Sequence, residues 1–269
     1  MEHLEVIKSP SNSKVKYVNS LIKKSNKRRE DNVYVVEGLR MVLDAPFCDI
    51  RSVFVSESLL IKESRIKELL DNCKAHDVDV VLVSDKVMKN MSDTITPQGV
   101  LAIVAQKTYE VDTTKETFLL LEDIQDPGNL GTLFRTAEAA GIDEIIMSRD
   151  CVDIYNPKTI RSTMGTIYRM PHFRCKDRNE WQEVIKVLIN NGITLYGGAL
   201  SKSISYDKVD YTKRIGIVIG NEGNGISDET LDMINRIHIP MEGQIESLNA
   251  AMAGGIIMYE MHRQRCDMK

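Results

Sequence analysis

Short apolar runs divide the first hundred residues into alternating strands and helices. Runs rich in Val, Ile and Phe predict strands, and apolar residues spaced three or four apart predict helices. The expected strands are residues 32–38, 50–57, 78–85 and 99–106, and the expected helices are residues 14–31, 39–45, 58–77 and 86–93. Asn12 or Ser13 is expected to cap the first helix. This pattern predicts a small α/β/α domain over residues 1–107.

A polar stretch without any period, "TYEVDTTKE", follows at residues 108–116 and is expected to be a linker. The alternation of strands and helices then restarts over residues 117–269. The expected strands are residues 117–124, 143–148, 193–200, 214–223 and 237–241, and the expected helices are residues 129–141, 156–170, 180–192, 227–236 and 247–265. Such alternation predicts an α/β domain with a parallel sheet that is covered on both faces.

Composition places the chain among globular proteins, since 42% of its 269 residues are hydrophobic. No apolar run approaches the roughly 20 residues of a membrane-spanning helix, and the N-terminus lacks the apolar core of a signal peptide. The five cysteines and five histidines are scattered and show neither C-x-x-C nor H-E-x-x-H spacing. We therefore expect reduced thiols in a cytoplasmic protein, no membrane partner and no metal site.

Charge is distributed unevenly, although the net charge is only −4. The stretch from Lys8 to Arg29 contains many lysines and arginines and no acidic residue, whereas the rest of the chain is acidic on balance. Such asymmetry indicates either a basic face that binds nucleic acid or a solvated helix face, and the stretch alone favours neither.

Three loops in the second half follow expected strands and lead into expected helices. They are "DPGNLGTLFR" at residues 126–135, "GNEGNGIS" at 220–227 and "IPMEGQIESLNAA" at 239–251. The first lacks the third glycine of a dinucleotide fingerprint, and the second lacks the lysine of a phosphate-binding P-loop. Because ligands of open α/β sheets bind beyond the carboxyl ends of the strands, three such loops indicate one shared site.

Two residues in these loops have both an ordinary and a functional interpretation. Arg135 occupies a helix position where an arginine is usually a solvent-facing charge, but it lies within about one turn of the glycine loop and is able to bind a phosphate or a hydroxyl there. Ser247 is expected near the N-cap of the last helix, with Leu248 and Asn249 in its first turn. A cap alone does not account for Asn249 or for the small residues of "AAMAGG" that follow.

Taken together, the three loops resemble the three sequence motifs of the SpoU (TrmH-type) RNA ribose 2′-O-methyltransferases of the SPOUT superfamily. The matching residues are Asn129, Gly131 and Arg135 in the first motif, Gly220, Asn221, Glu222 and Gly223 in the second, and Pro240, Ser247, Leu248 and Asn249 in the third. The segment "NVYVVEGLRMVLDA" likewise resembles the N-terminal substrate-binding domain of this family. The resemblance covers nearly the whole chain.

The resemblance implies an N-terminal RNA-binding domain and a C-terminal α/β SPOUT domain with a deep C-terminal trefoil knot. It further implies S-adenosyl-L-methionine as cofactor and a homodimer in which the last helix, with its Ala/Gly face, takes part and Arg135 serves across the interface. Carried over by motif position, the catalytic residues are Arg135, Asn129, Glu222, Ser247 and Asn249, and the cofactor-binding residues are Gly220, Asn221, Gly223, Ile239, Met241 and Leu248. The residues expected to contact RNA are Lys23, Lys24, Lys27, Arg28, Arg29 and Arg161.

Within this resemblance, a ribosomal RNA substrate is favoured by the separate N-terminal domain. A tRNA substrate, or a non-catalytic RNA-binding protein on the same fold, is the alternative. A nucleotide-dependent oxidoreductase ranks third, because its glycine spacing is absent. Since the pKa of arginine exceeds about 12, Arg135 is expected to position the ribose and its phosphate rather than to act as a base.

Overall fold

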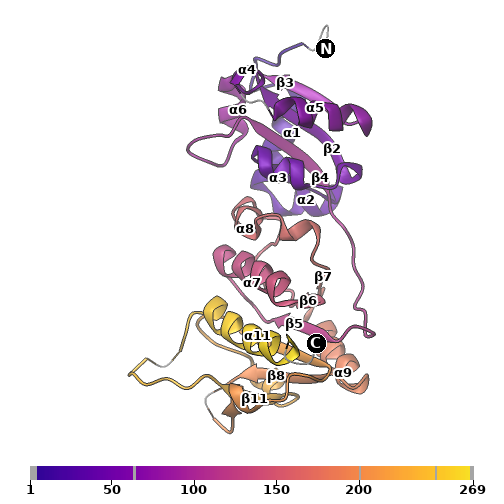
Figure 1. The fold of residues 1–269 in the computed structure, drawn as a ribbon. Coiled ribbons are helices and arrows are strands. Elements are labelled where there is room, and N and C mark those ends of the chain that lie inside the picture. The colour runs from indigo at the N-terminus through magenta and orange to yellow at the C-terminus, as the bar shows by residue number, and fades with distance from the viewer. Residues whose placement is uncertain (1–4, 63–64, 200, 246, 267–269) are drawn as a thin grey trace. The chain divides into compact units, whose positions relative to one another are not determined.

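The computed structural model describes residues 5–62, 65–199, 201–245 and 247–266 (Figure 1). By its internal contacts the chain divides into two compact units. The first unit comprises Met1–Lys107 and Asp153–Tyr168, and the second comprises Thr108–Val152 and Arg169–Lys269. The domain boundaries expected from the sequence stay a prediction, but the segment Asp153–Tyr168 packs with the first unit although it lies within the expected second domain.

A four-stranded mixed sheet with strand order β1-β4-β2-β3 forms the centre of the first unit. Its strands are β1 (Val33–Glu37), β2 (Ile50–Ser56), β3 (Asp79–Val83) and β4 (Val100–Ala105), as the apolar runs predict. Its helices are α1 (Ser13–Lys23), α2 (Ser25–Asp31), α3 (Leu39–Asp44), α4 (Glu57–Lys62), α5 (Ile66–Ala75) and α6 (Asp85–Met91), with a 3₁₀ turn η1 (Phe47–Asp49). Buried residues of α1 and α6 join those of the strands in one apolar core.

Two helices expected as single elements are each divided in the structure. The expected helix 14–31 breaks at Lys24, whose backbone is extended, into α1 and α2. The side chain of Arg28 stabilises this break, because its guanidinium donates to the last-turn carbonyls of α1 at Leu21 (2.5 Å) and Ile22 (3.1 Å). The expected helix 58–77 is likewise present as α4 and α5, and residues 63 and 64 between them lie outside the described ranges.

The segment Asp153–Tyr168 contains α8 (Pro157–Thr163) and the 3₁₀ turn η2 (Thr166–Tyr168). Its Asp153 carboxylate accepts two hydrogen bonds from the buried guanidinium of Arg28, at 3.2 Å from Nε and 2.5 Å from Nη2. The ring of Tyr155 packs against that of Tyr34 of β1 at 4.7 Å between centroids. A buried ion pair and a contact between two aromatic rings therefore attach this segment to the first unit.

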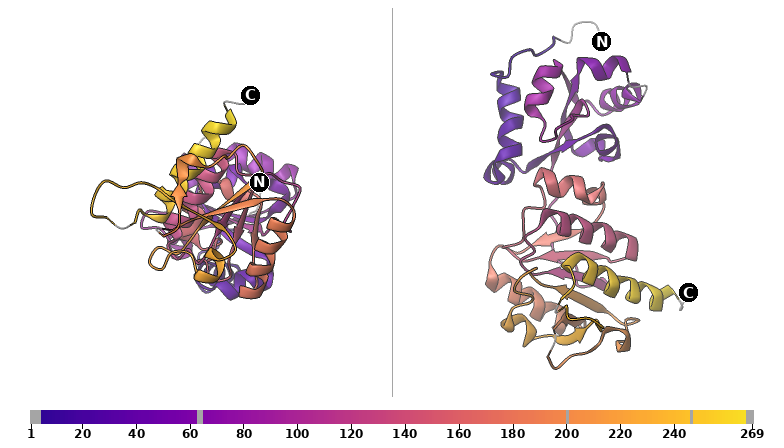
Figure 2. Two further views of the ribbon diagram at one scale, coloured as in Figure 1. Left: turned by 90° about the horizontal axis from the view of Figure 1, so that it is seen from below. Right: turned by 90° about the vertical axis from the view of Figure 1, so that its left-hand side faces the viewer.

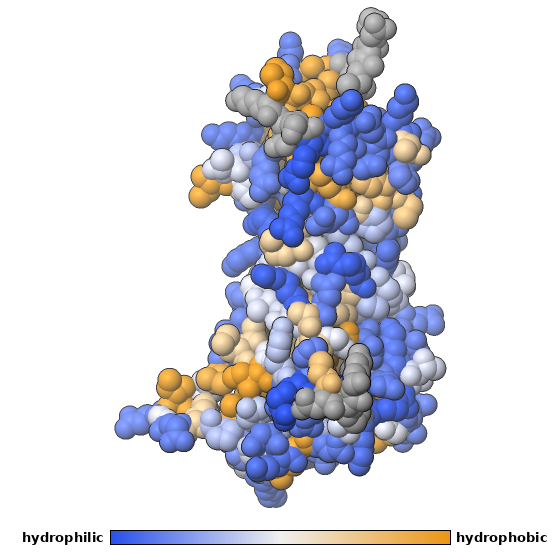
Figure 3. Space-filling model, in the orientation of Figure 1, coloured by the Kyte–Doolittle hydropathy of each residue, from blue (hydrophilic) through white to orange (hydrophobic). Residues whose placement is uncertain are grey.

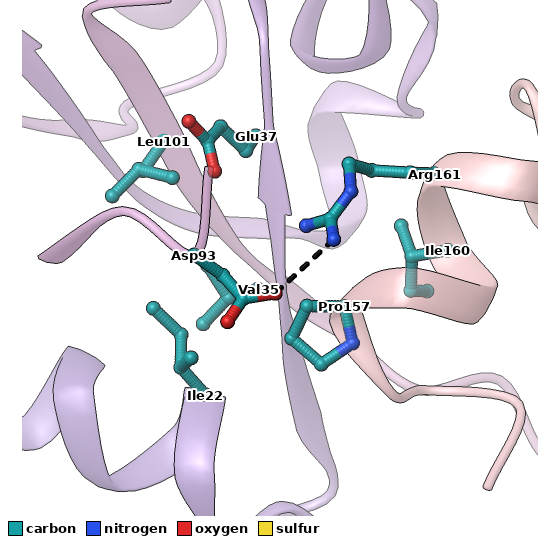
Figure 4. A pocket seen from close by; sticks show the side chains of 8 residues that line it. All are labelled: Ile22, Val35, Glu37, Asp93, Leu101, Pro157, Ile160 and Arg161. Atoms are coloured by element: carbon teal, nitrogen blue, oxygen red, sulfur yellow. Dashed lines mark hydrogen bonds and ion pairs between the residues drawn. The ribbon is translucent and has the colours of Figure 1, made fainter. Parts of the chain in front are cut away.

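A small pocket lies beneath α8 (Figure 4). Its lining consists of Ile22, Val35, Glu37, Asp93, Leu101, Pro157, Ile160 and Arg161. Arg161 points toward Asp93, and their Nη2 and Oδ2 atoms are 3.1 Å apart (Figure 4). Arg161 is thus engaged in an ion pair at the docked end of α8.

The second unit is built on a parallel sheet of seven strands with the order β7-β6-β5-β10-β8-β11-β9. Its strands are β5 (Thr117–Leu121), β6 (Glu144–Met147), β7 (His172–Arg174), β8 (Thr194–Gly198), β9 (Ile204–Ser205), β10 (Ile215–Ile219) and β11 (Asn235–His238). Its helices are α7 (Pro127–Ala140), α9 (Arg178–Asn190), α10 (Asp228–Leu231) and α11 (Ala250–Cys266), with a 3₁₀ turn η3 (Tyr206–Lys208). The predicted parallel α/β fold is confirmed, the short strands β7 and β9 were not predicted, and the trefoil knot stays a prediction.

Helices cover both faces of this sheet (Figures 1 and 2). The α9 side chains Trp181, Ile185 and Leu188 share a core with Phe118 and Leu120 of β5. On the other face α11 lies beside α7 and over β10, where a Cβ added to Gly254 would come within 2.6 Å of Leu133. Gly254 therefore serves close packing within the chain, and the expected part of α11 in a dimer interface stays a prediction.

Replacing Asp153 with Ala is expected to lower the free energy of unfolding by about 3–5 kcal/mol, because it leaves the Arg28 guanidinium buried without its counter-charge. The side chains of Arg28 and Asp153 are only 4% and 14% exposed. The matched control is Asp79→Ala, which breaks an exposed pair with Lys14 (57% and 53% exposed) and should cost less than about 1 kcal/mol. Urea unfolding measures both, and equal losses would contradict a structural role for the buried pair.

Candidate functional site

The loops after β5, β10 and β11 leave the same edge of the second sheet, because these strands are parallel. One chain of side-chain hydrogen bonds joins all three. The Asn249 amide donates to Asn129 Oδ1 at 3.0 Å, and the Asn129 amide donates in turn to Glu222 Oε1 at 2.9 Å. The three sequence motifs thus meet in one place, with Asn129 at the centre.

Glu222 binds the first loop through backbone as well as side-chain donors. Its carboxylate accepts hydrogen bonds from the backbone N–H groups of Gln125 and Asp126, each at 3.1 Å, besides that from Asn129. Desolvation alone would raise the pKa of Glu222, but these donors outweigh it and lower the pKa below its ordinary value. Glu222 is therefore a carboxylate at neutral pH and serves as an acceptor, not as an acid.

The second loop is a tight turn that Asn221 shapes. Its amide donates to the carbonyl of Asp123 at 2.8 Å, while its Oδ1 accepts from the backbone of Gly223 (2.9 Å) and Asn224 (3.0 Å). A Cβ added to Gly220 would come within 2.3 Å of the Gly225 backbone, so only glycine fits at position 220. This loop is held rigidly against the start of the first.

Glu122 lies below the loops and was not singled out from the sequence. It is 5% exposed and accepts hydrogen bonds from Ser227 Oγ at 2.6 Å and Thr230 Oγ1 at 3.1 Å. Desolvation raises the pKa of Glu122 even though these bonds act against it. The signal in the sequence that could have identified Glu122 is an acidic residue directly after the apolar run of residues 118–121.

The last helix begins later than expected, and its cap is Asn249 instead of Ser247. Asn249 Oδ1 accepts from the backbone N–H groups of Ala251 (3.0 Å) and Met252 (3.2 Å), and α11 starts at Ala250. Asn249 is better placed than Ser247 for this role because its amide nitrogen also bonds to Asn129. Ser247 and Leu248 are exposed residues ahead of the helix.

The residues expected to contact the cofactor belong to the loops that follow β10 and β11. Ile239 and Met241 are partly buried, and Leu248 is 38% exposed. They combine apolar side chains with the glycine-rich backbone at Gly220 and Gly223. Such a mixture suits a ligand that has both an apolar ring system and polar ends.

Arg135 lies on the exposed face of α7, whose opposite face, including Leu133 and Phe134, is fully buried. The helix begins at Pro127 with Asp126 as cap, which accepts from the Asn129 N–H at 2.8 Å. Among the residues that the structure describes, Arg135 forms no hydrogen bond or ion pair. Its guanidinium is therefore available to an anionic ligand.

The six basic residues expected to contact RNA all lie in the first unit. Lys23, Lys24 and Arg29 are exposed, and Lys27 is half-buried and bonded to Asp31 at 2.9 Å. The prediction that Arg28 contacts RNA is wrong. Its side chain is 3% exposed, and its guanidinium is hydrogen-bonded to Asp153 and to the last turn of α1. A buried, fully bonded arginine stabilises the fold and does not face a ligand.

Within the described ranges, no three His, Cys, Asp or Glu side chains are grouped so as to hold a metal ion. Across those same ranges, none of the helices has both the length and the apolar character to cross a membrane.

Two family profiles match the chain. That of the SpoU rRNA Methylase family matches residues 116–259, and that of the MRM3-like substrate binding domain matches residues 12–102. Both motif-bearing regions therefore fall inside recognised families.

Individual relatives match along nearly the whole chain. The 23S rRNA (guanosine(2553)-2'-O)-methyltransferase RlmP of Bacillus subtilis is 30% identical, covering 96% of this chain and 99% of that protein. The mitochondrial rRNA methyltransferase 3A of Danio rerio is 30% identical over 92% of this chain and 67% of its own length. An AdoMet-bound rRNA methyltransferase from Sinorhizobium meliloti superimposes with a TM-score of 0.85 at 28% identity, covering 96% of this chain and 97% of that one.

A Glu122→Gln variant should reveal the buried carboxyl through the pH dependence of stability. Because the pKa of Glu122 is raised above its ordinary value of 4.5, its carboxyl favours folding most below that pH, and stability falls as the pH rises through the folded-state pKa. Glutamine does not ionise, so the variant should gain stability relative to the unaltered chain as the pH rises above 4.5. Urea unfolding at several pH values measures this, and a difference that stays constant with pH would contradict it.

Proposed function

The chain belongs to the SpoU rRNA Methylase family, and on this premise we propose that it methylates a ribose 2′-hydroxyl of ribosomal RNA with S-adenosyl-L-methionine. The observation that carries the proposal is the series of hydrogen bonds Asn249–Asn129–Glu222, which joins the three motif loops at the helix α7 that also carries Arg135. Among the residues that the structure describes, the exposed Arg135 has no hydrogen-bond or ion-pair partner. The names of the relatives support ribosomal RNA as the substrate. We also propose a cytoplasmic location, in keeping with the scattered cysteines.

The loops after β10 and β11 fit S-adenosyl-L-methionine. Gly220 packs directly against the backbone of Gly225, which keeps the loop after β10 compact. Apolar surface for an adenine ring is offered by Ile239, Met241 and Leu248. Asn221 and Gly223 keep the loop in its tight conformation. When bound, S-adenosyl-L-methionine supplies a methyl group on a sulfonium, which needs no further activation.

Alignment of the ribose is then the main task of the protein. We assign this task to Arg135, whose guanidinium would hold the 2′-hydroxyl and a neighbouring phosphate and stabilise developing negative charge. Arginine stays protonated at any working pH, so the RNA phosphate is the proposed acceptor of the hydroxyl proton. Asn129, Glu222 and Asn249 fix the start of α7, and Ser247 is a proposed ribose contact.

The exposed basic residues of the first unit are proposed to bind RNA phosphates. Lys23, Lys24 and Arg29 have the exposure that this role requires. Lys27 is partly exposed and takes part after release from Asp31, to which its ammonium group is paired at 2.9 Å. Arg161 is included only after release from Asp93, since it is paired in the structure. Arg28 is left out.

We further propose a homodimer through the second unit. Ile245, Leu248, Met252 and Tyr259 are exposed at 69%, 38%, 61% and 51%, and they lie on α11 or on the loop before it. In Figure 3 apolar surface gathers at this loop and the start of the helix. Exposed apolar side chains in such number are typical of an interface.

An Arg135→Ala variant should lose methyl transfer by about 10²–10³-fold in kcat, the usual cost of removing one charge-stabilising donor. Binding of S-adenosyl-L-methionine, measured by calorimetry, should remain unchanged, because the cofactor is assigned to other loops. Methylation of a 23S rRNA transcript with radiolabelled cofactor measures the turnover.

The control for this variant is Arg178→Ala, which removes an arginine of the same unit that is 59% exposed. It should leave turnover within about twofold, the usual range for surface changes. Near-normal turnover of Arg135→Ala would refute the assigned role.

Replacing both Met252 and Tyr259 with Glu should shift the protein from dimer to monomer in sedimentation, because buried unpaired charge opposes association. Val187→Glu is the matched control, since Val187 is a 44% exposed apolar residue of α9, on the other face of the sheet. A monomer before any substitution, or equal effects of the two changes, would contradict this interface.

A further inference from the structure

A cleft of about 170 Å³ opens in the first unit between α1 and the sheet. Its lining consists of Lys14, Tyr17, Val33, Arg51, Ser52, Phe54, Asp79 and Ile103. The volume suffices for one aromatic ring system, because a cavity of about 150 Å³ holds benzene. Lys14 and Tyr17 belong to the basic stretch from Lys8 to Arg29, but none of the residues that line the cleft has been given a role above.

The cleft has an apolar floor and a charged rim. Val33, Phe54 and Ile103 form the floor and are 7%, 2% and 5% exposed. Lys14 and Arg51 are exposed at the rim. Lys14 Nζ lies 2.8 Å from Asp79 Oδ2, in an exposed pair that a ligand separates at little cost.

Arg51 is directed by an irregularity of the sheet. The pairing of β2 with β4 shifts between Ile50 and Ser52, so Arg51 is the extra residue of a β-bulge. Bulges re-aim a side chain and are frequent beside binding sites. Among the described residues Arg51 has no hydrogen bond or ion pair, which leaves its five N–H donors available.

The ring of Tyr17 is held in place at the cleft. Its hydroxyl donates to Asp31 Oδ2 at 2.7 Å, and the Lys27 ammonium lies 5.9 Å from the ring centroid. Burial, together with Asp31, raises the pKa of Tyr17 to about 12, so the phenol remains neutral and keeps this hydrogen bond. A fixed aromatic ring beside an apolar floor is a surface against which a flat ring stacks.

We propose that this cleft binds one unstacked nucleotide of the RNA substrate. The base enters against Tyr17 and the apolar floor, Asp79 accepts from an amino or imino group of the base, and Arg51 and Lys14 bind the adjoining phosphates. Proteins recognise single-stranded RNA by this combination of stacking, polar contacts to base edges and basic phosphate contacts. The identity of the ligand as RNA rests on the function proposed above.

The test compares Arg51→Ala with Lys67→Ala in the full chain, using binding of a 23S rRNA transcript measured by filter retention. Both variants remove one exposed positive charge that has no partner among the described residues. We expect Arg51→Ala to weaken binding about tenfold and Lys67→Ala by less than twofold. Equal losses of affinity would mean that Arg51 contributes only non-specific positive charge, and this result would overturn the proposal.

Ser52→Trp fills the cleft without changing the charge. If its thermal unfolding midpoint matches that of the unaltered chain, it should weaken binding as much as Arg51→Ala does, and unaltered affinity would overturn the proposal. If it does not fold, ultraviolet crosslinking of the transcript to the unaltered chain decides. A crosslinked nucleotide on Tyr17 supports the cleft, and crosslinks confined to other peptides refute it.

Methyl transfer separates this proposal from the function on which it rests. Arg51→Ala should raise the KM for the transcript about tenfold and leave kcat unchanged. If the unaltered chain methylates no RNA yet crosslinks through Tyr17, the proposed function fails and the cleft stands. If the chain is active and the cleft variants behave as Lys67→Ala, the cleft fails alone.

Discussion

The side chain of Asn129 is the junction on which the candidate site depends. Its amide oxygen accepts from Asn249 and its amide nitrogen donates to Glu222, so one planar group connects the first loop to residues that lie 93 and 120 positions further along the chain. The two hydrogen bonds require an amide at this position, because one partner needs an acceptor and the other needs a donor. An aspartate or leucine of similar size at this position would leave at least one partner unsatisfied.

Below this junction, polar groups are buried in a way that shapes the loops. Glu122 holds the start of α10 through Ser227 and Thr230, and the indole of Trp181 donates to the same threonine at 3.1 Å. The loop after β10 is therefore bound both at its tip, by Glu222, and at its exit, by Glu122. The pKa values of these two carboxylates shift in opposite directions. That of Glu222 is lowered because hydrogen-bond donors outweigh its partial desolvation, and that of Glu122 is raised because the group is deeply buried.

Much of this architecture could be predicted from local sequence. The continuous apolar run of residues 118–121 forms most of a central parallel strand, as predicted. The three motif residues Asn129, Glu222 and Asn249 lie together. Local patterns failed where a distant group decided the outcome. Asn249 and not Ser247 caps α11 because its partner Asn129 comes from α7, and the first helix ends at Lys23 because Arg28 folds back on it. Strands as short as β9 carry too few residues for any period.

The segment Asp153–Tyr168 has a consequence for how the protein is made. The chain leaves the second unit after β6, contributes α8 to the first unit, and then returns to form β7. The first unit is thus discontinuous in sequence, and Arg28 has no counter-ion until Asp153 has been synthesised. During translation the first unit therefore completes its folding only after about 60 residues beyond Lys107 have emerged from the ribosome. These residues include β5, α7 and β6 of the second unit. A fragment that ends at Lys107 would lack the segment Asp153–Tyr168 and could not complete the first unit. The first unit therefore completes its folding only after part of the second unit has been synthesised.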